Sequence, residues 1–186
     1  HLIHSIKRHK TKMTNNYIIS LGSNQGDSLR ILQQAAKALE KNKQLKILQK
    51  SSIYKTLPWG KTDQPVFLNA AMVVSWSGEP EELMQFLLAT EASFGRKREI
   101  HWGPRTLDLD MIYGWSVERQ STLLRLPHPY FWERPFVLVP MEDMVPDFSF
   151  QGTPIHQRLL ELKGYDEVER TTFSWEGDVS WQKQSE

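Results

Sequence analysis

Two aspartates, Asp108 and Asp110, stand two positions apart in the apolar stretch LDLDM. On a β-strand the side chains at i and i+2 point to the same face. The two carboxylates would then lie side by side, while Leu107, Leu109 and Met111 point into a core. A helix would separate the two acids by roughly 200° and scatter the leucines. The pattern therefore favours a strand that presents a pair of carboxylates.

Carboxylates this close to each other either share a proton or hold a cation between them. Because the chain has no cysteine and no closely spaced histidines near the aspartates, oxygen ligands favour magnesium over zinc. An ordinary alternating strand with a solvated polar face explains the same spacing. The residues alone leave both interpretations open.

Basic residues flank the aspartates in the sequence and would supply phosphate-binding charge. The forked donors of a guanidinium suit phosphate oxygens, and a metal held by the aspartates would bridge such oxygens. The arginines concerned are Arg96, Arg98, Arg105 and Arg134. Together these features indicate phosphoryl transfer. A solvated basic turn at 96–98 and a purely structural role for His128 remain the alternatives.

Two further polar residues interrupt apolar patterns. Asn69 lies inside FLNAAMVV, and a buried amide needs hydrogen-bond partners, which a planar ligand with donors and acceptors would supply. Glu91 falls on the apolar arc of a helix expected over residues 80–94, so it also needs a partner. A glutamate at the edge of the core is the alternative for Glu91.

The composition excludes several classes of protein. The chain has 186 residues, of which 23 are basic and 22 acidic, and a net charge of +1 argues against nonspecific nucleic-acid or membrane binding. The absence of cysteine excludes disulfides and thiolate metal sites and fits a cytoplasmic location. Apolar runs are too short to cross a bilayer. P-loop, Rossmann, GxSxG and HExxH motifs are missing.

The first twelve residues differ from the rest of the chain. Residues 1–12 carry four Lys or Arg and no acid, and they lack the apolar core of a secretory signal. We interpret them as an extension before a natural start at Met13, with a basic targeting segment as the alternative. Residues 13–186 are expected to form a single domain.

The elements that must position these residues alternate in type. Strands are expected over 17–21, 46–54, 67–76, 107–111 and 136–139. Helices are expected over 28–41, 80–94 and 155–162, with Asp27 or Ser28 as the cap of the first. The segment 56–65 is longer than a usual connection and is a candidate for function. This order predicts an α+β, ferredoxin-like sandwich, with an antiparallel sheet and helices packed on it.

Four motifs, spaced in one order, resemble a known family. They are YIISLGSNQGD, YKTLPWGKTDQPVFLNA, WGPRTLDLD and LPHPYFWERPFVL, and they extend from residue 17 to about residue 146. The resemblance is to 6-hydroxymethyl-7,8-dihydropterin pyrophosphokinases of folate biosynthesis. It implies a ferredoxin-like fold and transfer of pyrophosphate from ATP, the co-substrate, to the hydroxymethyl group of the pterin, with release of AMP.

The resemblance also implies roles for individual residues. Two magnesium ions would be held by Asp108 and Asp110. The mobile catalytic arginines would be Arg96 and Arg105. ATP would be bound by Glu91, Arg98, Trp102, Arg105, His128, Tyr130 and Arg134. The pterin pocket would consist of Thr56, Trp59, Phe67, Asn69, Trp102 and Phe136, with the ring between Phe67 and Phe136.

The expected partners are therefore two small molecules, ATP and the hydroxymethyl-dihydropterin, bound by a cytoplasmic monomer without nucleic acid or membrane. Three positions depart from the family pattern: His101 stands in place of an arginine, Leu88 in place of a polar residue, and Leu123 in place of a basic one. These departures concern nucleotide affinity more than the reaction.

Two rival functions remain to be compared with this one. A single-stranded nucleic-acid binder would stack bases on Trp59, Phe67 and Trp102, although the aspartates would repel the phosphate backbone. A metal-dependent hydrolase would combine the aspartates with His101 or His128.

Overall fold

The computed structural model describes residues 13–56, 66–95 and 106–177, and the structural statements below concern these residues. The helices and strands are β1 (Thr14–Ser23), α1 (Ser28–Glu40), β2 (Leu45–Lys50), β3 (Tyr54–Thr56), β4 (Phe67–Ser77), α2 (Pro80–Ser93), β5 (Asp108–Gly114), β6 (Arg119–Gln120), β7 (Arg125–Leu126), η1 (Phe131–Glu133), α3 (Pro135–Met144), β8 (Ser149–Phe150), β9 (Thr153–Pro154), α4 (Ile155–Glu161), η2 (Tyr165–Glu167) and β10 (Val168–Arg170).

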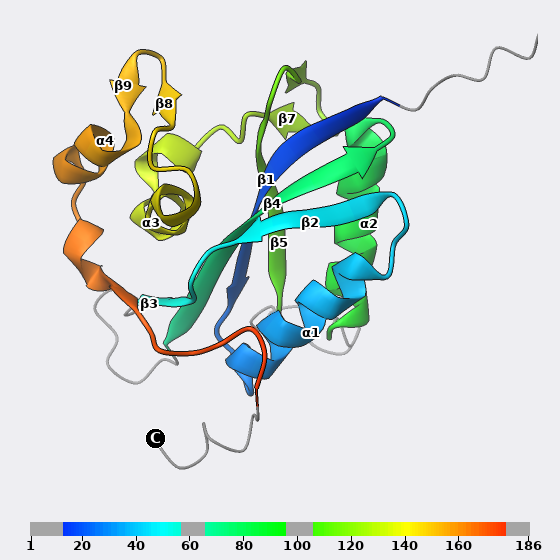
Figure 1. Ribbon diagram of the computed structural model, residues 1–186, viewed down its shortest axis with the longest axis horizontal. Coiled ribbons are helices and arrows are strands. Elements are labelled where there is room, and N and C mark those ends of the chain that lie inside the picture. The colour runs from blue at the N-terminus through cyan, green and yellow to red at the C-terminus, as the bar shows by residue number, and fades with distance from the viewer. Residues whose placement is uncertain (1–12, 57–65, 96–105, 178–186) are drawn as a thin grey trace, which may run out of the picture.

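An antiparallel sheet forms the centre of the molecule (Figure 1). Its strands lie in the order β10-β3-β4-β1-β5, and β2 also pairs with β4. Strand β4 is long enough for two partners on one edge, because β2 pairs with its residues 72–76 and β3 with its residues 67–69. Strand β1 lies between β4 and β5. The near-continuous apolar runs of β1 and β4 fit strands that are covered on both faces.

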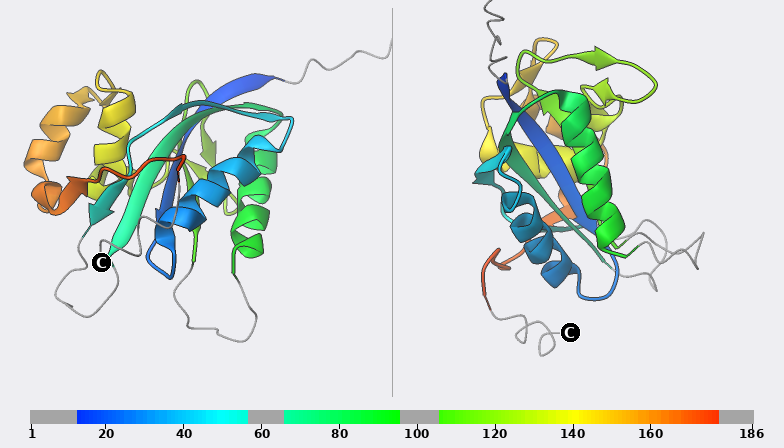
Figure 2. Two further views of the ribbon diagram at one scale, coloured as in Figure 1. Left: turned by 60° about the horizontal axis from the view of Figure 1, so that its bottom comes forward. Right: turned by 90° about the vertical axis from the view of Figure 1, so that its right-hand side faces the viewer.

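Helices pack on both faces of this sheet (Figure 2). On one face, apolar residues of α1 and α2 form a core cluster with alternate strand residues, among them Leu109 and Met111 of β5. On the other face, Val137 and Leu138 of α3 form a second cluster with residues of α4. The structure thus confirms the expected α+β class, in which helices pack on an antiparallel sheet.

The helices of the first face begin close to where the sequence predicts them. The start of α2 has Pro80, which needs no N–H partner there, and acids that favour the positive end of the helix dipole. Helix α1 follows Asp27, but neither candidate cap bonds the helix through its side chain. The hydroxyl of Ser28 instead donates to the carbonyl of Gln25 at 3.3 Å. Asp27 is therefore the N-cap residue, as expected, but it lacks the side-chain hydrogen bond of a typical cap.

The strand predicted over 136–139 is also wrong, because these residues lie in the first half of α3. Pro135 occupies the first turn of this helix, where its missing N–H costs nothing. The buried residues Val137, Leu138, Met141 and Met144 recur at helical spacing and face the sheet. The predicted strand 136–139 covers only four residues, which is too short a stretch to show the helical period.

The strand predicted over 46–54 is interrupted. It forms β2 and β3, and residues 51–53 between them still follow β4. The N–H of Ser51 donates to the carbonyl of Ala71, and the N–H of Ala71 donates to the Ser51 hydroxyl, both at 2.9 Å. The break is therefore an irregularity within one edge of the sheet.

Residues after Pro146 complete the sheet on the β3 side. Strand β10 pairs with β3, and two residues of the following segment bond the 51–53 break. The Thr171 hydroxyl donates to the carbonyl of Ile53, and Trp175 Nε1 donates to the carbonyl of Ser51, both at 2.7 Å. Within the described ranges, no helix combines the length and the apolar character needed to cross a bilayer.

Candidate active site

The two aspartates lie on the same face of β5, as the spacing predicts. Asp108 is half-buried and Asp110 is exposed, whereas Leu109 and Met111 between and after them are buried in the cluster of the opposite face. Successive residues on one face of a strand stand about 7 Å apart. The pair therefore forms a short row of carboxylates on the face that α3 covers further along the sheet.

The register of three strands brings Asp108 into line with Asn69. Gly22 of β1 pairs with Asp108 on one side and with Asn69 on the other. Neighbouring strands are about 4.8 Å apart, so Asp108 and Asn69 are separated by about 10 Å across a residue without a side chain. A Cβ at Gly22 would lie 3.1 Å from Asn69 Oδ1. Because Gly22 has no side chain, no side chain of β1 stands between the Asn69 amide and the Asp108 carboxylate at this level of the sheet.

Gly22 was missed as a candidate site residue by the sequence analysis. The signal was available, because a glycine that closes the β-rich run YIISL marks a place where another group approaches the backbone closely. What the sequence alone did not provide was the pairing of this glycine with both strands.

On the far side of Gly22, residues of β3 and β4 continue the same face of the sheet. Asn69 is 6% exposed, and its Nδ2 donates to Thr56 Oγ1 at 3.2 Å. An amide offers one more donor and two acceptor positions. Phe67 pairs with Thr56, so it projects from the same face as Asn69 two residues later. Three of the predicted pterin residues are therefore neighbours in this structure.

His128 has fixed backbone and ring contacts. Its N–H donates to the carbonyl of Ile112 at 2.8 Å, and its Nδ1 accepts from the N–H of Tyr130 at 3.2 Å. Burial lowers the pKa of His128, the Arg134 charge lowers it further, and the Asp110 charge opposes both. At neutral pH the ring is uncharged, with Nδ1 the acceptor and Nε2–H the donor.

The titration of His128 is a direct check of this arrangement. Its imidazole should titrate below the ordinary value of 6.5, and Asp110→Asn should lower its pKa further because Asp110 is the charge that raises it. Since the unfolded chain takes up this proton first, the stability contributed by His128 is complete above pH 6.5 and is lost as the pH falls below it. NMR of the ring protons measures the pKa; a value at or above 6.5 would contradict the geometry.

Arg134, Tyr130 and Phe136 lie together at the start of α3. The Arg134 guanidinium carbon is 5.6 Å from the centre of the Tyr130 ring and 5.9 Å from that of Phe136. Phe136 is 36% exposed and Tyr130 56% exposed, so both rings are accessible to a ligand. The Arg134 cation thus lies beside both rings, and one of them, Phe136, is a residue expected in the pterin pocket.

Glu91 is buried, at 7% exposed, and bonds the strand of the aspartates. Its Oε1 accepts the N–H of Leu109 at 2.6 Å. Leu109 lies between Asp108 and Asp110, and β5 is the edge strand of the sheet in the described part of the chain. The bond therefore satisfies a backbone donor that no described strand takes. The sequence predicts that a buried Glu91 needs a partner, and the backbone of β5 is one such partner.

Residues 94 and 106, which flank the undescribed residues 96–105, are bonded to each other and to β1. The Thr106 hydroxyl donates to the carbonyl of Phe94, and the Ser23 hydroxyl donates to the carbonyl of Thr106 at 2.5 Å. Gly95 has a φ of 135°, and a Cβ there would lie 2.6 Å from Thr106 Oγ1. Only glycine therefore allows the end of α2 to approach the start of β5 this closely.

Several predicted site residues lie outside the described residues. They are Trp59 from the pterin pocket, Arg96, Arg98, Trp102 and Arg105 from the catalytic and ATP sets, and the departure His101. The departures Leu88 and Leu123 are described and are 49% and 56% exposed.

The donor set suits magnesium. Within the described ranges, no group of three or more His, Cys, Asp or Glu side chains could hold a metal ion. Magnesium binds through one or two carboxylates and takes its remaining ligands from water and substrate phosphates, whereas a catalytic zinc ion needs three protein ligands. By this chemistry Asp108 and Asp110 would suit magnesium.

Comparison with known proteins gives consistent matches. The family model described as 7,8-dihydro-6-hydroxymethylpterin-pyrophosphokinase (HPPK) matches residues 18–146. A 2-amino-4-hydroxy-6-hydroxymethyldihydropteridine pyrophosphokinase from Methylorubrum extorquens is 38% identical over 159 residues, which are 84% of this chain and 100% of the relative. One of the same name from Bacillus subtilis is 38% identical over 141 residues, which are 76% and 84% of the two chains.

A solved structure has the same fold. It is an HPPK-DHPS triple mutant from Plasmodium falciparum, with a TM-score of 0.64 at 16% sequence identity. The match covers 85% of this chain and 45% of that one. At this identity the likeness concerns the fold alone.

Proposed function

Because the chain belongs to the 7,8-dihydro-6-hydroxymethylpterin-pyrophosphokinase family and is an ATP-dependent pyrophosphokinase of folate biosynthesis, we propose its reaction and the residues that perform it. The enzyme transfers pyrophosphate from ATP to the hydroxymethyl group of 6-hydroxymethyl-7,8-dihydropterin. The hydroxyl oxygen bonds to the β-phosphorus and the bond from that phosphorus to the α–β bridging oxygen breaks. AMP leaves, and the hydroxyl proton passes to water.

One observation carries the assignment of the site: Asn69, Gly22 and Asp108 are paired across three strands. The pterin ring binds at the Asn69 end, where an amide recognises a planar ring with donors and acceptors. The phosphates bind at the aspartate end. The hydroxymethyl group then lies over Gly22, the residue whose missing side chain leaves room for it.

The pterin pocket is formed by groups with defined partners. Thr56 orients the Asn69 amide through their hydrogen bond. Phe67 and Phe136 hold the ring between them, with Trp59 as a further wall and Trp102 closing the pocket. Aromatic faces in such a position supply contact area and exclude water from the reacting hydroxyl.

The phosphate end combines carboxylates with cations and one neutral ring. Asp108 and Asp110 would hold two magnesium ions, which when bound would lower the pKa of the substrate hydroxyl and neutralise phosphate charge. Neutral His128 donates its Nε2–H, and Arg134 offers its forked donors. Arg98, Tyr130 and Glu91 complete the ATP site. Arg96 and Arg105 stabilise the charge that develops in the transition state.

A single incubation tests the reaction. With ATP, magnesium and hydroxymethyl-dihydropterin, the wild-type protein should produce AMP and the pyrophosphorylated pterin in equal amounts, separated by chromatography. Accumulation of ADP would indicate transfer of one phosphoryl group and contradict the proposal. Hydrolytic activity of the protein in an incubation from which ATP is omitted would favour a metal-dependent hydrolase. Tight, salt-sensitive binding of single-stranded nucleic acid without ATP binding would favour the nucleic-acid alternative.

We further propose that the enzyme is a cytoplasmic monomer that acts only on small molecules. The lack of cysteine and the near-neutral net charge support this proposal. Light scattering of the purified protein measures its mass in solution, and a mass twice that of the chain would contradict the monomer.

A further inference from the structure

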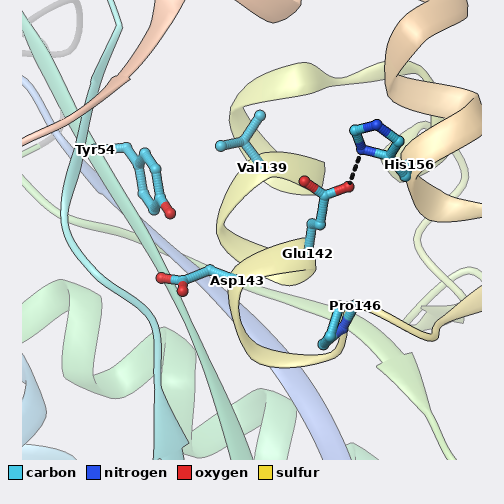
Figure 3. Close-up of a pocket in the computed structure, with 6 residues that line it drawn as sticks. All are labelled: Tyr54, Val139, Glu142, Asp143, Pro146 and His156. Atoms are coloured by element: carbon cyan, nitrogen blue, oxygen red, sulfur yellow. Dashed lines mark hydrogen bonds and ion pairs between the residues drawn. The ribbon is translucent and has the colours of Figure 1, made fainter.

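A cavity lies between α3, β3 and α4, apart from the row of Asn69 and the aspartates. Its volume is about 570 Å³, and it is lined by Tyr54, Val139, Glu142, Asp143, Pro146 and His156 (Figure 3). Its polar side chains bond to the protein itself. Glu142 Oε2 and His156 Nδ1 are 2.9 Å apart and join α3 to α4. These bonds indicate a junction between elements more than a site for a second ligand.

Asp143 forms the connection between α3 and the edge of the sheet. The N–H of Ser52 donates to Asp143 Oδ2 at 2.7 Å, although the two residues are 91 positions apart. The Asp143 carboxylate also acts on the Tyr54 phenol, because its charge raises the pKa of that group. Figure 3 shows the two side chains extending toward each other from β3 and α3. One carboxylate thus bonds the break before β3 and faces the first residue of β3.

Tyr54 is a buried residue that faces an acid. It is 7% exposed, and burial raises the pKa of its phenol to about 12, with a further increase from the Asp143 charge. The phenol is therefore protonated at neutral pH.

Both partners of this contact lead directly to the proposed pterin pocket. Tyr54 pairs with Asn69, and Thr56 follows it on the same face of β3. Phe136 lies seven residues before Asp143 on α3, which is about two turns or roughly 10 Å along the same side of a rigid helix. The two walls of the pocket, Thr56 with Asn69 and Phe136, are thus joined through Asp143.

We propose that Asp143 is a positioning residue for the pterin site, fixing α3 with Phe136 against β3 with Thr56 and Asn69. This inference rests on the proposed function, because the pocket it sets is the pocket of the pterin substrate. Asp143 does not contact the substrate. It acts on pterin affinity more than on the nucleotide site, whose aspartates and His128 lie outside α3.

The test compares Asp143→Ala with Asp143→Asn. The alanine variant should raise the KM and the Kd for the pterin about tenfold, while the KM for ATP stays within about twofold of wild type. The asparagine variant keeps an acceptor for the Ser52 N–H and should recover most of the affinity. Tyr54→Phe removes only the hydroxyl that faces Asp143 and should give an intermediate KM.

Glu142→Gln is the matched control, because Glu142 is the neighbouring acid in the same cavity and bonds α4 in place of β3. It should leave both KM values unchanged. Tyrosinate absorbance during alkaline titration gives a second readout. In Asp143→Asn the pKa of Tyr54 should fall below its wild-type value of about 12, because the negative charge beside the phenol is removed.

Either of two results would overturn the inference. One is a lower melting temperature of Asp143→Ala with both KM values unchanged, which would assign Asp143 a role in stability alone. The other is an equal rise in both KM values. Wild-type AMP formation, measured first, separates these outcomes from a failure of the proposed function: if the wild type forms AMP, only the inference about Asp143 is at stake.

Discussion

The Asp110→Asn variant should lose pyrophosphoryl transfer by roughly 10²- to 10³-fold or more in kcat while keeping its fold. Asparagine has nearly the same shape, and Asp110 is exposed on β5, so the replacement disturbs no packing. It removes a negative oxygen ligand from the edge where the phosphates bind, and a neutral amide is a poor ligand for magnesium. AMP formation at saturating ATP and pterin measures the loss.

Two accompanying measurements identify the cause. Titration calorimetry with magnesium and a non-hydrolysable ATP analogue should show weakened metal-dependent nucleotide binding, while the melting temperature stays that of wild type. Asp147→Asn, an exposed aspartate in the turn after α3, is the matched control and should behave as wild type. Undiminished turnover of Asp110→Asn in magnesium would remove the metal assignment and the proposed mechanism with it.

The Arg105→Ala variant should lower kcat by roughly 10²- to 10³-fold and change both KM values much less. Arg105 directly precedes Thr106, whose carbonyl is held by Ser23, and it stands three positions before Asp108 in the chain. A guanidinium in this part of the sequence suits charge that develops on phosphate oxygens in the transition state more than charge already present in bound ATP. Steady-state kinetics with each substrate varied separates the two effects.

Arg96→Ala should show the same division between kcat and KM. Lys37→Ala removes an exposed cation from α1, the helix on the opposite face of the sheet, and should leave all kinetic constants unchanged. If Arg105→Ala raised the KM for ATP as much as it lowered kcat, Arg105 would be a ground-state binding residue and its catalytic role would be wrong.

The sequence predicted the features that depend on a local period. A period of two placed Asp108 and Asp110 on one face and their leucines in the opposite core, and both are found there. Helical spacing and the Pro-Glu-Glu start placed α1 and α2 within a few residues. Such signals arise from neighbouring residues, so they can be recognised before the fold is known.

Features that depend on distant pairing could not be predicted. The alignment of Asp108, Gly22 and Asn69 depends on the register of three strands, and no local pattern contains it. The bond between Glu91 and the Leu109 N–H depends on where α2 crosses the edge of the sheet. The sequence could state only that a buried Glu91 needs a partner. Asp143 gave no signal at all, since an acid near a helix end is ordinary.

The error at 136–139 has a physical cause. Val137 and Val139 favour strands, and an apolar run of four residues fits a short buried strand as well as a helix. Packing against the sheet decided the outcome, because Val137, Leu138, Met141 and Met144 bury one side of α3. Pro140 inside the helix further obscured the pattern, although it is tolerated within the short α3.

The base of the β3–β4 connection has a consequence for evolution. Thr56 and Phe67 are register partners, so the polypeptide between them leaves and re-enters the sheet at adjacent points. Each doubling in the length of such a connection adds only about 0.6 kcal/mol to its closure entropy. Insertions and deletions there should therefore be accepted with little loss of stability, so any constraint on this stretch comes from the proposed role of Trp59 in the pterin pocket and not from the stability of the fold.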